Sequence, residues 1–268
     1  MILVIITALI PALILGWWIY KKDSLRPEPL RMLYKAFLYG VGSTFVTLVI
    51  TSFMSMAGLM VYDLGSFKGA VSTALLAAAL PEEISKLLML WLFLRNNPYY
   101  DEYLDGIVYA ACVGLGFAAT ENIMYLLQSS DWVGTGIVRG LTAVPAHFAI
   151  ACVMGYFYSK RNFGDRTTLT AVCVLAVPVI IHWVYDALAF SEGIYPALSV
   201  FINALFVLLI WLVYRGTMRR INTMHQLDHA RMSPPPLPPA PGTPTLPTTP
   251  GTPPPFSDGN DKNNTPLA

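Results

Sequence analysis

Charged residues are scarce in this chain of 268 residues. Only 12% are Asp, Glu, Lys or Arg, whereas 55% are hydrophobic. Soluble domains carry about 25% charged residues, so this composition argues against a soluble protein and favours one surrounded by lipid. The formal net charge of +1 provides no broad basic surface, and nucleic acid is therefore not expected as a partner.

Cysteines are few, and internal repeats are absent. The three cysteines, Cys112, Cys152 and Cys173, lie inside apolar segments and show no CxxC spacing. They predict neither a disulfide framework nor a cysteine metal site, and we interpret them as packing residues. The chain shows no inverted repeat of the kind that builds many secondary transporters.

Long apolar runs are what the sequence has in abundance. About 20 mostly apolar residues are needed to cross a bilayer as a helix. The sequence predicts an all-α integral membrane protein, a polytopic bundle of about seven transmembrane helices. The expected spans are 1–20, 33–60, 68–94, 104–128, 137–158, 168–190 and 196–214. The first run is expected to be a retained helix rather than a cleaved signal, because its basic residues follow it.

Basic residues gather in alternate connections, which predicts the orientation. Loops rich in Lys and Arg stay in the cytoplasm. The basic groups are Lys21, Lys22, Arg26, Arg31 and Lys35 in the first loop, Lys160, Arg161 and Arg166 in the fifth, and Arg215, Arg219 and Arg220 after the last span. We therefore expect the N-terminus outside and the C-terminus in the cytoplasm.

Proline marks a change in organisation near the C-terminus. Twelve of the 21 prolines fall in residues 233–256. We predict a transmembrane domain over residues 1–221 and a disordered, Pro-rich cytoplasmic tail over 222–268. Such a tail is expected to act as a spacer, or to bind the aromatic groove of a partner in polyproline II form.

The presence of ionisable residues inside the predicted spans requires an explanation. A charge at the middle of a membrane helix costs about 2.5 to 3.5 kcal/mol. Four successive spans nevertheless carry such groups at a common depth, namely Glu82, Glu83 and Lys86, then Glu121 and Asn122, then His147, then His182 and Asp186. A water-filled cavity open to the outer face would solvate them, and convergence from four helices is typical of a catalytic or transport site.

Helical spacing predicts how these residues pair. Glu82 and Lys86 are four residues apart and should form an ion pair, with Glu83 about 100 degrees away around the helix. His182 and Asp186 have the same spacing, so the carboxylate can orient the imidazole. Arg139 and Asp105 lie nearer to span ends, where we expect an interfacial anchor and a helix-start residue.

Five ordered motifs carry a family resemblance. They are Glu82-Glu83-x-x-Lys86 after a proline, Asp105-Gly106, Gly116-Phe117-Ala118-x-x-Glu121-Asn122, Arg139 followed by His147 and Gly155, and His182-x-x-x-Asp186. Together they resemble the PrsW-type intramembrane proteases, relatives of the CAAX prenyl proteases. The resemblance covers roughly residues 80–190. The CAAX proteases differ in having arginine in place of Lys86 and histidine in place of Glu121.

The resemblance implies an intramembrane endopeptidase of the bacterial cytoplasmic membrane. Its substrate would be a single-span membrane protein, typically an anti-sigma factor or similar regulator cleaved at site 1, and its other partner is membrane lipid. The expected catalytic residues are Glu82, Glu83, Glu121, His147 and His182, supported by Lys86, Asn122 and Asp186. Either Glu82 or Glu83 could activate water, and we favour Glu82.

Three alternatives use the same residues. The Glu-Lys group could be a structural ion-pair network between helices. Zinc bound by His147, His182 and Glu121 would give a metalloprotease, although the paired histidines of zincins are absent and we favour no cofactor. A proton-coupled transporter or channel would also place Glu, His and Lys inside the membrane.

Overall fold

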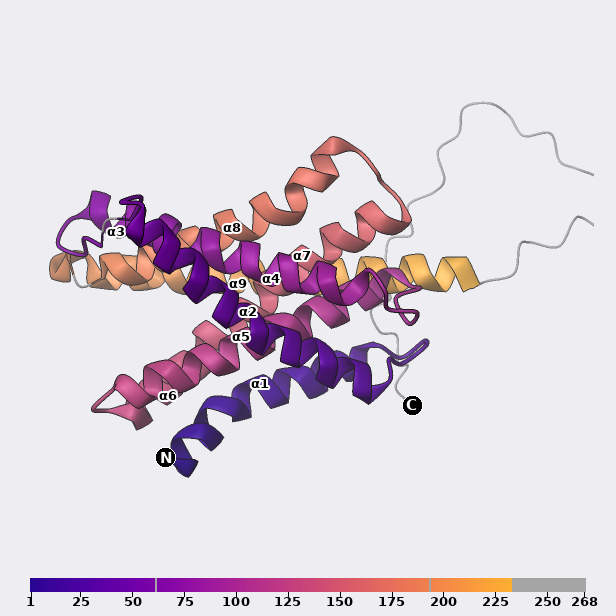
Figure 1. The fold of residues 1–268 in the computed structure, drawn as a ribbon, viewed down its shortest axis with the longest axis horizontal. Helices are drawn as coiled ribbons and strands as arrows, with labels where there is room; N and C mark the ends of the chain where they lie inside the picture. Colours follow the sequence, from indigo (N-terminus) through magenta and orange to yellow (C-terminus); the bar gives the residue numbers. More distant parts are fainter. Residues whose placement is uncertain (61, 193, 233–268) are drawn as a thin grey trace, which may run out of the picture. The chain divides into compact units, whose positions relative to one another are not determined.

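The computed structural model describes residues 1–60, 62–192 and 194–232 of the chain, and these are entirely helical between their connections. The elements in order are α1 (Ile2–Lys22), α2 (Leu30–Met56), α3 (Phe67–Thr73), the π-helical η1 (Ala74–Ala79), α4 (Leu80–Leu94), α5 (Tyr103–Gln128), α6 (Trp132–Leu141), α7 (Ala143–Phe163), α8 (Thr168–Ser191), the short η2 (Pro196–Leu198) and α9 (Ser199–Met232) (Figure 1). The predicted all-α class is confirmed.

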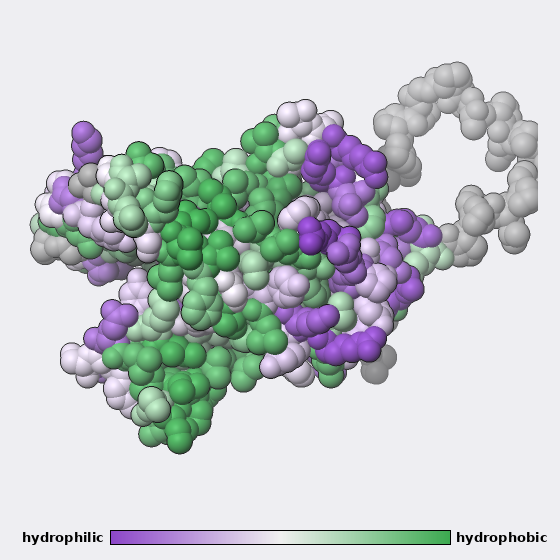
Figure 2. Space-filling model, in the orientation of Figure 1, coloured by the Kyte–Doolittle hydropathy of each residue, from purple (hydrophilic) through white to green (hydrophobic). Residues whose placement is uncertain are grey.

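Six helical segments of the described residues are long and apolar enough to cross a membrane: α1, α2, α5, α6 with α7, α8 and α9. The predicted third span corresponds to α3, η1 and α4, which follow one another over residues 67–94. Apolar side chains cover the flanks of the helices, and hydrophilic ones gather toward one end (Figure 2). The protein is therefore a polytopic membrane protein, while the number of seven spans stays a prediction.

Helix α5 lies at the centre of the bundle and is buried along most of its length. Two glycine contacts let its neighbours approach closely. A Cβ on Gly40 of α2 would lie 2.0 Å from the Val113 carbonyl oxygen, and one on Gly155 of α7 would lie 2.2 Å from the Gly106 carbonyl oxygen. Small residues commonly allow such backbone approach in membranes. Both contacts hold α2 and α7 against α5.

The connections of the bundle lie at two ends (Figure 1). The α1–α2 and α4–α5 connections and the last turns of α9 lie at one end, which we call the α1–α2 end. The N-terminus and the α8–α9 connection lie at the other, which we call the α8–α9 end. This alternation is what successive membrane crossings require.

The C-terminal boundary that we predicted at residue 221 is wrong. Helix α9 continues to Met232, with Met224 and Asp228 buried. The Asp228 carboxylate accepts hydrogen bonds from the backbone N–H groups of Tyr103 (2.7 Å) and Leu104 (2.8 Å) at the start of α5. Residues 222–232 are therefore a folded part of the bundle. The Pro-rich segment from residue 233 lies outside the described residues.

Candidate active site

Prolines precede the polar residues on three of the helices. Pro81 comes directly before Glu82 and follows the π-helical η1, Pro145 lies in the first turn of α7, and Pro178 lies inside α8 four residues before His182. Proline lacks an N–H and interrupts the helical hydrogen bonds of the preceding turn. Such irregular backbone is tolerated in a membrane where it is buried in protein or lines a cavity.

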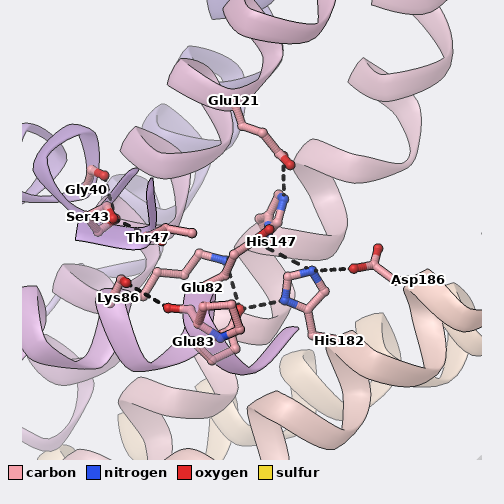
Figure 3. A network of polar contacts seen from close by, with 12 residues as sticks. Gly40, Ser43, Thr47, Glu82, Glu83, Lys86, Glu121, His147, His182 and Asp186 are labelled. Atoms are coloured by element: carbon pink, nitrogen blue, oxygen red, sulfur yellow. Dashed lines mark hydrogen bonds and ion pairs between the residues drawn. The ribbon is translucent and has the colours of Figure 1, made fainter. Parts of the chain in front are cut away.

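Lys86 is the centre of the polar network (Figure 3). Its Nζ donates to Glu83 Oε1 at 2.8 Å and to Glu82 Oε2 at 3.2 Å, and lies 3.1 Å from His147 Nδ1. The ammonium also lies 3.9 Å from the centre of the Phe117 ring. The Lys86 side chain is almost completely buried, so these contacts replace water as its solvation.

His182 lies between carboxylates. Its Nδ1 is 2.8 Å from Glu83 Oε1, and its Nε2 is 3.3 Å from Asp186 Oδ2 and 3.8 Å from Glu82 Oε2. Ionised carboxylates accept hydrogen bonds and cannot donate them. Both ring nitrogens therefore have acceptors facing them, an arrangement that suits the doubly protonated imidazolium.

His147 has the opposite surroundings. Its Nδ1 faces the Lys86 ammonium, which can only donate, while its Nε2 is 2.9 Å from Glu121 Oε2. The ring must therefore accept at Nδ1 and donate from Nε2, so His147 is the neutral Nε2–H tautomer. The two histidine rings stack edge to face with their centres 5.1 Å apart. Neighbouring imidazoles thus hold different charges.

Arg139 completes the network on the α6 side. Its Nη2 donates to Glu121 Oε2 at 2.7 Å and its Nε donates to the Asn122 carbonyl oxygen, Oδ1, at 2.8 Å. Its guanidinium also lies 3.8 Å from the centre of the Tyr125 ring. We predicted an interfacial anchor here, and this prediction is wrong because the α5–α6 turn directs Arg139 back into the bundle. Its place between Asp131 and His147 in the sequence gives no signal of that direction.

A cavity of about 430 Å³ reaches the network from the α8–α9 side. Glu82, Glu121, His147, His182 and Asp186 line it, together with Arg139 and with residues of α8 and α9 such as Tyr185 and Phe206. A second cavity, of about 300 Å³, is also lined by Glu82 and Glu121. Glu83 lines neither, since it is fully buried between Lys86 and His182. Glu82 is therefore the member of the pair that a substrate or water could reach.

The structure brings together all the residues that we predicted for the site. Glu82, Glu83, Lys86, Glu121, Asn122, His147, His182 and Asp186 belong to one connected set of polar contacts. The predicted ion pair between Glu82 and Lys86 is confirmed at 3.2 Å, and Lys86 also pairs with Glu83 at 2.8 Å, a contact that we did not predict. Asp105 accepts from the Glu102 backbone N–H and forms a capping box, as expected of a helix-start residue.

Comparison with known proteins identifies the family. The family model described as "PrsW family intramembrane metalloprotease" matches residues 28–214. The chain belongs to the PrsW family. It is 33% identical to Protease PrsW of Geobacillus kaustophilus over 204 residues, which cover 75% of this chain and 84% of that protein. No solved structure matches the chain.

Two further relatives agree with this assignment. The chain is 31% identical to Protease PrsW of Clostridioides difficile, covering 76% of this chain and 85% of that protein. It is also 31% identical to Protease PrsW of Bacillus subtilis, covering 73% and 87% respectively. The matched region of the PrsW family model includes every residue of the polar network, from Glu82 to Asp186. The chain is thus a PrsW-family membrane protease.

Proposed function

We propose that this chain hydrolyses a peptide bond of a membrane-anchored protein with Glu82 as the general base. The proposal is based on the different access of the two glutamates to the cavity. Glu82 lines the cavity, whereas Glu83 is enclosed by Lys86 and His182. A base must reach the water whose proton it removes, which favours Glu82.

Hydrolysis then proceeds in two steps. Glu82 takes a proton from a cavity water as the water oxygen attacks the carbonyl carbon of the substrate. The resulting oxyanion needs hydrogen-bond donors, which the Nε2–H of His182 and the guanidinium of Arg139 can supply from the cavity wall. The C–N bond breaks as the proton held by Glu82 passes to the leaving amine, which returns Glu82 to its ionised form.

The remaining residues hold these groups in place. Lys86 and Glu83 form the buried pair against which Glu82 and His182 are oriented. Glu121 orients His147 and is itself held by Arg139. Asp186 contacts the second nitrogen of His182, which supports the charged imidazole. Removal of Lys86 would leave the buried charges of Glu82 and Glu83 without their shared cation.

A metal-dependent mechanism is the second candidate. The family description implies a metal ion, and Glu82, Glu83, His147 and His182 each offer an atom within 4.8 Å of the others. Glu83 Oε2 is also buried without a hydrogen-bond partner among the described residues. Two imidazoles and carboxylates are a donor set that zinc uses.

The arrangement of these donors nevertheless does not fit zinc. Lys86 Nζ lies within 3.2 Å of atoms of three of the four groups, so an ammonium already takes the central position. Both ring nitrogens of His147 are engaged, one by Lys86 and one by Glu121. Zinc would require Lys86 to leave, and the mechanism proposed here uses no metal.

The position of the cavity supports a membrane protein as the substrate. The cavity is walled by the membrane helices α8 and α9 near the α8–α9 end, so a substrate would approach from within the membrane or from that surface. We propose a single-span protein such as an anti-sigma factor, in the bacterial cytoplasmic membrane. The basic connections at the α1–α2 end, with Lys21, Lys22 and Arg26, favour a cytoplasmic position for that end and an outer position for the N-terminus.

The test is cleavage by purified protein in detergent micelles with single-span candidate substrates. We expect two fragments from the wild type, with ¹⁸O from labelled water in the new carboxyl terminus. His147→Ala and His182→Ala should each impair turnover strongly while the protein remains folded. A proton-coupled transporter predicts no cleavage and a proton flux in liposomes, and that result would replace the protease proposal.

A further inference from the structure

A second cluster of buried carboxylates lies outside the active site, at the α1–α2 end. Asp23 follows α1, while Glu102 and Asp105 lie at the start of α5. All three residues are at least 95% buried, and each offers an oxygen within 4.8 Å of the others. The proteolytic mechanism uses none of these residues, so their burial requires another explanation.

Backbone contacts hold each of the three carboxylates in place. Asp23 Oδ2 accepts from the Glu28 N–H at 2.8 Å, and Asp105 Oδ2 accepts from the N–H groups of Glu102 (2.6 Å) and Asp101 (3.0 Å). The Glu102 side chain accepts from the Asp105 N–H in the capping box. The positions of these carboxylates are therefore fixed by the main chain, before any ligand binds.

Each carboxylate also keeps an oxygen with no hydrogen bond. Asp23 Oδ1, Glu102 Oε1 and Asp105 Oδ1 are buried and have no hydrogen-bond partner among the residues that the structure describes. Buried polar atoms are almost always paired, and an unpaired one costs about 1 to 3 kcal/mol. Three acceptor oxygens in one cluster lack a hydrogen bond, and only Glu102 Oε1 has an ion pair, with Arg26 at 3.5 Å, which indicates a missing positive partner.

The charges nearby do not balance. Glu28 and Asp228 are buried beside the three carboxylates, and Asp101 lies at the rim. Arg26 pairs with Asp101 at 3.0 Å and reaches only 3.5 Å from Glu102 Oε1, with its own side chain 60% exposed. Near Asp228, Arg231 contributes positive charge. The α5 N-terminus supplies only about half a positive charge.

At the active site, by contrast, Lys86 lies against Glu82 and Glu83, and Arg139 lies against Glu121.

We propose that Asp23, Glu102 and Asp105 bind a hard divalent cation, Ca²⁺ or Mg²⁺, at the α1–α2 end of the bundle. The donors are all oxygen, the ligand type that these ions prefer. Ca²⁺ binds oxygen at 2.3 to 2.6 Å, so ligand oxygens on opposite sides of it lie about 4.6 to 5.2 Å apart, and a spread of 4.8 Å fits one ion. The ion would join the α1–α2 connection to the start of α5.

The experiment is calorimetric titration of the purified chain in detergent, after EDTA treatment and dialysis, with CaCl₂ and separately with MgCl₂. We expect saturable binding of about one ion per chain and a higher unfolding temperature in the presence of that ion. Asp23→Asn with Glu102→Gln should weaken binding at least about tenfold. Asp101→Asn is the matched control, because it removes a neighbouring acid at the rim, and its affinity should stay within about threefold of the wild type.

Two results would overturn the proposed cation site. The first is the absence of saturable binding of either ion by the wild type. The second is unchanged affinity in the double variant, which would place the ion elsewhere. If the double variant does not fold, Asp23→Asn alone takes its place, since the amide oxygen still accepts from the Glu28 N–H. Unchanged affinity in that single variant would overturn the proposal equally.

Discussion

The two buried carboxylate clusters of this chain differ in their supply of positive charge. In the active site, Glu82 and Glu83 face Lys86, and Glu121 faces Arg139. At the α1–α2 end, Asp23, Glu102 and Asp105 have oxygens without hydrogen bonds, and only Arg26 approaches, from the rim. The first cluster contains buried cations, whereas the second has only the partly exposed Arg26 at its rim.

This difference separates two uses of buried acids. A carboxylate paired with a resident cation is held in one position, which suits a base that must act on a water molecule. A carboxylate held by the backbone but left without a cation is an incomplete ligand set. Burial of acidic residues alone would not distinguish the two clusters, and the distinction depends on where the lysine and arginine side chains lie.

Lys86→Met makes the active-site cluster lack its buried cation, as the second cluster does, and should have the largest effect on stability. It removes the cation from a buried network and leaves Glu82 and Glu83 unneutralised, which should lower the free energy of unfolding by about 3 to 5 kcal/mol. The measurement is the folded fraction in detergent across a thermal ramp. Lys86→Met combined with Glu83→Gln should recover part of the loss, and a double variant as unstable as the sum of the two single variants would contradict the network.

Glu82→Gln tests which glutamate acts on water. The amide keeps the size and polarity of the side chain but removes the base, so cleavage per folded molecule should fall about 100-fold or more with little loss of stability. Glu83→Gln is the matched variant. It should mainly reduce the amount of folded protein, because it weakens the pairs with Lys86 and His182. Full specific activity in both variants would exclude a glutamate base.

The sequence predicted the membrane class and the membership of the site because both depend on local signals. Apolar run length indicates spans, and ionisable residues inside those runs are costly enough to mark a site. Spacing along one helix also indicated the contact between His182 and Asp186, which the structure contains at 3.3 Å. These signals need no knowledge of how the helices are rotated against one another.

The remaining features depend on that rotation. The shorter pair of Lys86 is with Glu83, since α8 presents His182 to Glu83 from the other side. Arg139 reaches Glu121 because the α5–α6 turn brings α6 back along α5. The cluster at the α1–α2 end joins Asp23 to Glu102 across 79 positions of sequence, and no local pattern indicates it. Likewise, the continuation of α9 to Met232 follows from packing of Met224 and Asp228.

When divalent ions are removed, Asp23→Asn should raise the free energy of unfolding, whereas Lys86→Met should lower it. Asp23→Asn deletes one of several like charges that the nearby cations do not fully balance, so the free energy of unfolding in EDTA should rise by about 1 kcal/mol or more. The hydrogen bond from the Glu28 N–H is retained by the amide oxygen. A lower unfolding temperature in EDTA would show that the ionised Asp23 is needed without a metal.

The smallest effect is expected from removal of the Pro-rich segment. Truncation after Met232 keeps all of α9, including Asp228 and its bonds to α5, so cleavage and unfolding temperature should match the full chain. A cut after Asn222 would remove Asp228 and would confound the test. Loss of cleavage in the chain ending at Met232 would assign the segment a role in catalysis rather than in tethering or recruitment.

Cleavage by metal-free enzyme tests most directly whether catalysis needs a metal. In the proposed mechanism, Lys86 takes the position of a metal and Glu82 activates water without one. Purified protein should be stripped with chelator, its zinc content measured by mass spectrometry, and its rate on a single-span substrate compared before and after stripping. We predict an unchanged rate at far less than one zinc ion per chain. A rate that is lost on stripping and restored by stoichiometric zinc would show that the enzyme is a metalloprotease.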